Sequence, residues 1–110
     1  MIKTKQAGNS IIVYLKGRLD VHLSAEIEKE LNKLIDENTK ADLIINMREV
    51  EYMSSSGLRI LVAAMRILKE KDRSLRLCAL NSAVRKVFEV VELIDMFEVY
   101  DTEEEAVQAS

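Results

Sequence analysis

Three consecutive serines followed by a glycine are the residues of this chain best suited to chemistry. Ser54, Ser55 and Ser56 precede Gly57, an apolar strand-like run precedes them, and apolar residues at helical spacing follow: Leu58, Leu61, Val62, Met65 and Leu68. This pattern predicts that the serines lie where a strand passes into a helix. The first turn of a helix offers unpaired N–H groups and partial positive charge. A serine there can cap the helix, and a phosphate attached there would be stabilised.

The sequence argues against an enzyme. Its single histidine, His22, would have to serve any Ser-His-Asp triad, and the serines lack the leading glycine of the Gly-x-Ser-x-Gly turn. We therefore interpret His22 as a polar loop residue just before a helix cap. The three glycines are too far apart to form a phosphate-binding loop. We predict no catalytic residue.

An acidic run near the carboxyl end of the chain is the other cluster with chemical potential. Thr102 is followed by Glu103, Glu104 and Glu105, which is the pattern of a helix capping box. Consecutive residues point in different directions around a helix, so these acids would not converge on one ion. We predict a solvated first helical turn, no metal site and no cofactor.

Composition narrows the remaining classes of protein and of binding partner. The chain has 110 residues, 48% hydrophobic and 32% charged, which is typical of one globular domain. The net charge is −3 and no basic stripe is present, which argues against a nucleic-acid partner. Cys78 is the only cysteine, and we interpret it as a small buried hydrophobe. Without a signal-like or membrane-length apolar segment, we expect a cytoplasmic protein with no membrane partner.

Alternating strand and helix patterns surround the serines. Strands are predicted at residues 1–5, 10–16 (ended by Gly17), 42–47, 74–80 and 97–100. Helices are predicted through residues 23–35 with Ser24 as the cap, from about 56 to 71, after Asn81 or Ser82, and after Thr102. The order is β-β-α-β-α-β-α-β-α. It predicts a single α/β domain over residues 1–110, with a mixed, mainly parallel sheet of about five strands and four helices.

Two motifs in this order resemble those of the STAS domain, and most closely the bacterial anti-sigma factor antagonists. They are Gly17-Arg18-Leu19-Asp20 and Met53-Ser54-Ser55-Ser56-Gly57-Leu58. The resemblance implies a partner switch without enzymatic activity of its own. The antagonist would bind an ATP- or ADP-binding anti-sigma factor that is also a serine kinase, and so release a sigma factor. Phosphorylation of the serine before the glycine, here Ser56, would end the binding.

Two departures from the family pattern leave two interpretations open. Ser54 stands where aspartate is usual before the serine pair, and Asn46 stands where aspartate is common at the end of the central strand. Both changes would remove negative charge near Ser56. Either the site is still phosphorylated, with Ser54 hydrogen-bonding as the aspartate would, or the chain is a non-switching scaffold or transport accessory subunit.

The carboxyl ends of adjacent strands, where α/β sheets place their sites, predict a partner surface around Ser56. Its members would be Asp20, Val21, His22, Met53, Ser54, Ser55, Gly57 and Leu58. Other roles remain open: the serines could only cap a helix, Gly57 could only allow tight packing, and Met53 and Leu58 could belong to the core. The oligomeric state is also open, since residues 90–97 are rich in apolar side chains that could cover the sheet or form a contact patch.

Overall fold

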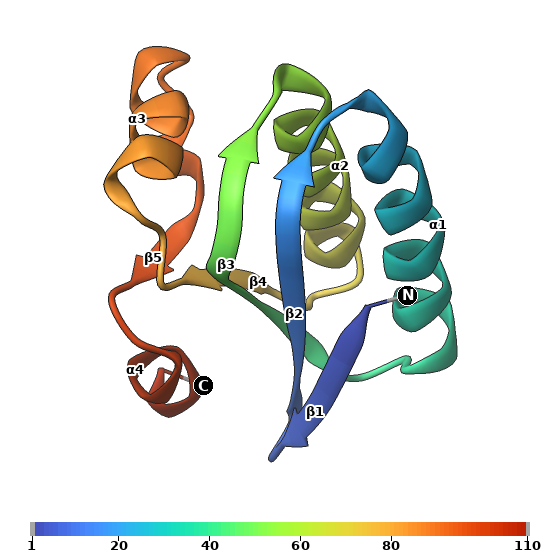
Figure 1. Ribbon diagram of the computed structural model, residues 1–110. Helices are drawn as coiled ribbons and strands as arrows, with labels where there is room; N and C mark the ends of the chain where they lie inside the picture. Colours follow the sequence, from blue (N-terminus) through green and yellow to red (C-terminus); the bar gives the residue numbers. More distant parts are fainter. Residues whose placement is uncertain (1, 110) are drawn as a thin grey trace.

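The computed structural model describes residues 2–109, arranged as a five-stranded sheet with helices on both faces (Figure 1). The strands are β1 (Lys3–Ala7), β2 (Ser10–Leu19), β3 (Asp42–Met53), β4 (Leu75–Cys78) and β5 (Glu98–Tyr100). The helices are α1 (Val21–Glu37), α2 (Ser55–Glu70), α3 (Ser82–Val90) and α4 (Glu103–Gln108), with a short 3₁₀ turn, η1 (Ile94–Met96). The sheet order is β1-β2-β3-β4-β5, antiparallel between β1 and β2 and parallel elsewhere. The predicted fold class is confirmed.

Two apolar clusters hold the layers together. The larger one joins the buried faces of α1, α2 and α3 to one face of the sheet, and it includes Leu31, Leu61 and Phe88. The smaller one, on the other face, consists of Ile12, Ile44, Cys78 and Ala106 beneath α4. The prediction that Cys78 is a buried hydrophobe is confirmed.

The central strand β3 is about twice as long as predicted. The sequence pattern predicts its end at Met47, because charged and polar residues follow. In the structure the strand continues to Met53, but β4 pairs only with residues Leu43 to Asn46. The second half of β3 therefore has a sheet neighbour only in β2, and of its last six residues only Val50 and Met53 are buried. In the sequence, this half-exposed strand has the polar composition of a loop.

Strand β2 also runs further than predicted, because Gly17 bends it and does not end it. Gly17 has a φ of +87°, a conformation that favours glycine, and it lies at register shifts in the pairing of β2 with β3. Beyond this bulge the strand pairs again, with Leu19 opposite Met53. The irregularity brings the carboxyl ends of β2 and β3 level with each other.

The helix starts are capped, and one cap differs from the prediction. Asp20 caps α1, where its carboxylate accepts a hydrogen bond from the Leu23 N–H at 3.0 Å. Ser24 was predicted for this role but lies in the buried face of the helix, and His22 lies within the first turn and not in a loop. The caps at Asn81 and Thr102 are confirmed, the latter with a complete capping box.

The apolar segment after α3 divides between core and surface. Phe97 is buried and meets Phe88 edge-on, with ring centroids 5.4 Å apart. Val90, Val91 and Met96 are exposed, Val90 by 71%. Within residues 2–109, no helix is both long and apolar enough to cross a bilayer.

Candidate functional site

The starts of α1 and α2 meet at the backbone of Leu19. The carbonyl oxygen of Leu19 accepts two hydrogen bonds from Ser54, one from its N–H at 3.0 Å and one from its hydroxyl at 2.7 Å. The same hydroxyl accepts a bond from the Gly57 N–H at 3.2 Å, so Ser54 caps α2. Leu19 is followed directly by Asp20, the cap of α1. One residue pair therefore links the two helix starts at the carboxyl edge of the sheet.

Gly57 makes this close contact possible. A Cβ atom at this position would lie 3.0 Å from the Leu19 Cβ and 3.1 Å from the Leu19 carbonyl oxygen. Both separations are tighter than most Cβ contacts, so a side chain here would push Leu19 and the first turn of α2 apart by a few tenths of an ångström, and glycine lets them rest directly on each other. The packing role for Gly57 that the sequence left open is thus present in the structure.

Ser55 and Ser56 occupy the first turn of α2 beside this junction. Ser55 is exposed and Ser56 is half-buried. First-turn N–H groups have no partner within the helix, and in the described part of the chain no hydrogen bond uses those of Ser55 or Ser56. Arg59 is exposed and lies three residues after Ser56, which makes the two neighbours on the helix surface. These donors and this cation make the site suited to an anionic group.

The other predicted partner-binding residues separate into surface and core. Asp20, Val21 and His22 are exposed at the start of α1, Val21 by 71%. Met53, Gly57 and Leu58 are buried in the core beneath the serines. Packing against Leu19 and the sheet keeps these three residues below the surface, which is the core role that the sequence left open for Met53 and Leu58.

Two further exposed residues lie at the same edge and were missed from the sequence. Arg18 and Tyr52 are opposite each other in the register of β2 and β3, and the Arg18 guanidinium carbon lies 4.5 Å from the centre of the Tyr52 ring. Tyr52 is 42% exposed. Stacking of this kind orders both side chains, and tyrosine and arginine are the residue types enriched at energetically important points of interfaces. Finding the pair required the register beyond the Gly17 bulge.

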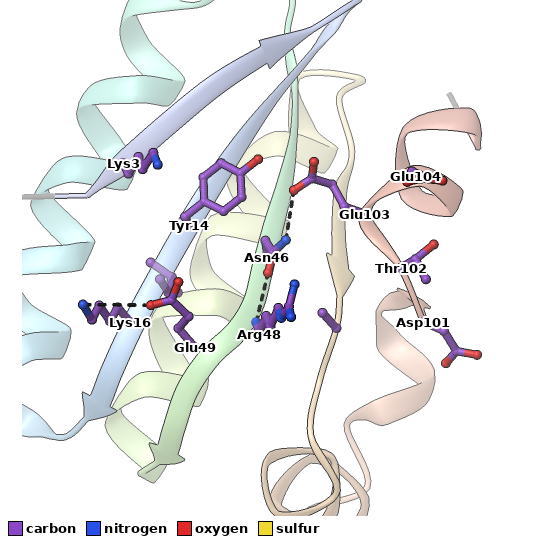
Figure 2. A pocket seen from close by; sticks show the side chains of 12 residues that line it. Lys3, Tyr14, Lys16, Asn46, Arg48, Glu49, Asp101, Thr102, Glu103 and Glu104 are labelled. Carbon is purple, nitrogen blue, oxygen red and sulfur yellow. Dashed lines mark hydrogen bonds and ion pairs between the residues drawn. The ribbon is translucent and has the colours of Figure 1, made fainter.

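A groove on the α4 face of the sheet is separate from the serines. It has a volume of about 870 Å³ and is lined by charged and polar residues of β1, β2, β3 and the start of α4, as Figure 2 shows. Asn46 lies here, in the middle of β3, and its amide donates to the Glu103 carboxylate at 2.9 Å. The prediction that Asn46 lies near Ser56 is wrong, because six residues of extended strand, roughly 20 Å, separate it from Met53.

The first turn of α4 is also less solvated than predicted, because Glu103 turns onto the sheet. Burial, together with Glu103, raises the pKa of Tyr14 to about 12 and that of the Cys78 thiol to about 11. Both groups are therefore neutral at physiological pH. Across residues 2–109 no group of three or more His, Cys, Asp or Glu side chains could hold a metal ion. Arg48 and Glu49 also line this groove, where Glu49 pairs loosely with Lys16 at 4.0 Å.

Comparison with known proteins identifies the family. The model of the STAS domain matches residues 1–106. The anti-sigma-B factor antagonist of Staphylococcus aureus is 30% identical over 79% of this chain and 80% of its own length. The anti-sigma factor antagonist SpoIIAA in its unphosphorylated form has a similar structure, with a TM-score of 0.83, 25% identity, and coverage of 99% of this chain and 95% of its own. The phosphorylated form of SpoIIAA from Bacillus gives a TM-score of 0.75 at 24% identity, covering 99% and 98%. The chain belongs to the STAS domain family, among the anti-sigma factor antagonists.

Proposed function

We propose that this protein binds an anti-sigma factor with serine kinase activity, releases a sigma factor by doing so, and is switched off by phosphorylation of Ser56. As a family member the chain is a regulatory binding protein and not an enzyme. The observation that carries the proposal is the start of α2, where the exposed Ser55 and the half-buried Ser56 stand next to the exposed start of α1. Because sigma factors act inside the cell, the proposal places the protein in the cytoplasm.

The proposed binding surface is the carboxyl edge of the sheet. It comprises the accessible members of the predicted set and the stacked pair found in the structure: Arg18, Asp20, Val21, His22, Tyr52, Ser54, Ser55 and Ser56. Two rigid helix starts and two strand ends carry these residues, so the surface is formed before a partner arrives. Such preorganisation reduces the entropy lost on binding.

A phosphate on Ser56 would stop binding without unfolding the protein. It adds roughly −1.5 to −2 charges at neutral pH. The free first-turn N–H groups and Arg59 would hold it, so the fold would remain intact. A partner covering Ser56 would have to desolvate this dianion, which costs several kcal/mol. A loss of about 4 kcal/mol lowers affinity about a thousandfold. SpoIIAA, solved with and without its phosphate, is a relative in which both states are folded.

The test is capture of partners from lysate of the native host with ADP added, using wild type and Ser56→Asp as bait. Wild type is expected to retain an ATP-binding anti-sigma kinase that Ser56→Asp loses, with nearly unchanged thermal stability. Ser82→Asp is the matched control, because it adds the same charge to an exposed serine at the start of another helix, α3. This control should bind like wild type.

Equal recovery of one partner by wild type and Ser56→Asp would contradict the phosphoswitch. If that partner were a scaffold or transporter component, the non-switching alternative would replace the proposal. Incubation of the retained kinase with ATP and the purified protein gives a second, independent check. Mass spectrometry should then find phosphate on Ser56, and the Ser56→Ala variant should remain unmodified.

A further inference from the structure

We propose that the Ser54 hydroxyl is a positioning group that ties the two helix starts of the binding surface together, beyond its role as a helix cap. Its significance for binding rests on the proposed function. The hydroxyl makes two bonds at once: it donates to the Leu19 carbonyl at 2.7 Å and accepts from the Gly57 N–H at 3.2 Å. The first bond crosses from α2 to the end of β2, and the second lies within the first turn of α2.

Only some cap residues can do both. Aspartate, asparagine, serine and threonine can all accept the N–H bond of a helix cap. An ionised aspartate has no proton to donate, so its carboxylate would stand opposite the Leu19 carbonyl oxygen with no hydrogen between them. The Ser54 N–H already bonds to that oxygen at 3.0 Å, which keeps the two backbones close. Aspartate at position 54 would therefore keep the cap and lose the tie.

The tie matters because Leu19 immediately precedes Asp20. Asp20 caps α1 through the Leu23 N–H and presents the exposed residues at the start of that helix. A displacement of Leu19 would move this cap. By holding the Leu19 carbonyl, the Ser54 hydroxyl therefore keeps the first turns of both α1 and α2 in place. A neutral cap also leaves Ser56 without a carboxylate in the same turn, so a phosphate there would meet less electrostatic repulsion.

Amide hydrogen exchange on the full-length protein can separate the tie from the cap. Ser54→Ala should speed exchange of the Gly57 and Leu23 N–H groups about tenfold or more. Ser54→Asp should restore protection at Gly57 but not at Leu23, and Ser54→Thr should restore both. The Ile45 N–H, in the core of β3, reports global unfolding, so its exchange rate gives the loss of overall stability that must be subtracted from the changes at Gly57 and Leu23.

If Leu23 exchange stays at the wild-type rate in Ser54→Ala, the proposal is overturned and Ser54 is only a cap. Full recovery of Leu23 protection by Ser54→Asp would overturn it as well. Should Ser54→Ala lower stability enough to change Ile45, the Thr and Asp variants still decide between the two roles. Both side chains can accept the cap hydrogen bond from the Gly57 N–H, but only threonine has a hydroxyl proton to donate to the Leu19 carbonyl.

Phosphorus NMR supplies a readout that a purely structural role would not change. Phosphoserine is installed at position 56 by genetic encoding, so no kinase is needed. The pKa of the second phosphate ionisation should be the same with Ser54 and Ser54→Thr, and higher by about 0.5 with Ser54→Asp. An equal pKa in all three would overturn the electrostatic part. Neither measurement uses the anti-sigma factor, so failure here is distinct from failure of the proposed function.

Discussion

At the scale of single residues, Gly57 should be intolerant of any side chain. Alanine is normally about 1 kcal/mol better than glycine inside a helix. Here its Cβ would lie 3.0 Å from the Leu19 Cβ and 3.1 Å from a backbone oxygen that cannot move independently of β2. We expect Gly57→Ala to lower the free energy of unfolding by about 1–3 kcal/mol, measured as a lower urea midpoint at unchanged slope.

Ser55→Ala is the control for Gly57→Ala, since it changes an exposed residue of the same helical turn. Its midpoint should lie close to that of wild type. A midpoint for Gly57→Ala equal to or above that of the control would mean that the start of α2 can move away from Leu19 without cost, and the close contact would then not fix the serines.

Cys78 gives a second prediction at this scale, in alkaline solution. Burial, and then the nearby Glu103 carboxylate, raise the pKa of its thiol from 9.0 to about 11. The folded state therefore holds this proton more tightly than the unfolded state does. Its stabilising effect is complete below pH 9 and is lost between about pH 9 and 11. A tenfold difference in proton affinity between the two states corresponds to about 1.4 kcal/mol of stability.

The measurement is urea unfolding at several pH values, comparing wild type with Cys78→Ala. Wild type should lose stability more steeply above pH 9 than the variant does. The pKa values of Tyr14 and Tyr100 are also raised, so the variant should keep part of the slope. Parallel curves would show that Cys78 ionises as readily in the folded protein as in the unfolded chain.

At the scale of elements, the sequence predicted the helices and strands whose patterns depend on residues close together in the chain. The helical spacing of α2, the first half of β3 and the capping box of α4 each depend on residues a few positions apart, and all were found. The second half of β3 was missed, because β4 is short and ends beside Asn46, so the side chains beyond Asn46 are only partly covered and include polar residues. How much of a strand is buried depends on the strands and helices beside it, which the sequence of the strand itself does not reveal.

The candidate site shows the same division. The serines at the start of α2 were predicted, because strand, cap and helix follow one another in the chain. The bond from Ser54 to Leu19 and the stacking of Arg18 on Tyr52 join residues 34 or more positions apart. They depend on the bulge at Gly17, which sets the register of β2 on β3. Asn46 was misplaced for a related reason, since its strand continues well beyond it.

At the scale of the whole molecule, the exposed large apolar side chains favour one end. Within residues 2–109 they are Val21, Tyr52, Val90, Val91 and Met96. Figure 1 shows the carboxyl end of α3, which carries Val90, at the same end of the molecule as the starts of α1 and α2. The Asn81 side chain anchors the start of α3 by donating to the Val50 carbonyl at 2.8 Å, so this helix accompanies the second half of β3 toward the serines. The arrangement extends the proposed binding surface from the helix starts to the carboxyl end of α3, and leaves Ser82 at the other end of that helix outside it.

We therefore expect Val90→Lys to weaken binding of the proposed anti-sigma factor at least about fivefold, since a lysine there would replace apolar contact with a charge needing solvation. Because Val90 is 71% exposed, the free energy of unfolding should change by no more than about 0.5 kcal/mol. Thr4→Lys adds the same charge at an exposed β-branched residue of β1 and should bind like wild type. Titration calorimetry on the three proteins measures this. Equal weakening by both lysines would trace the effect to net charge, whereas equal affinity in all three would confine the interface to the helix starts.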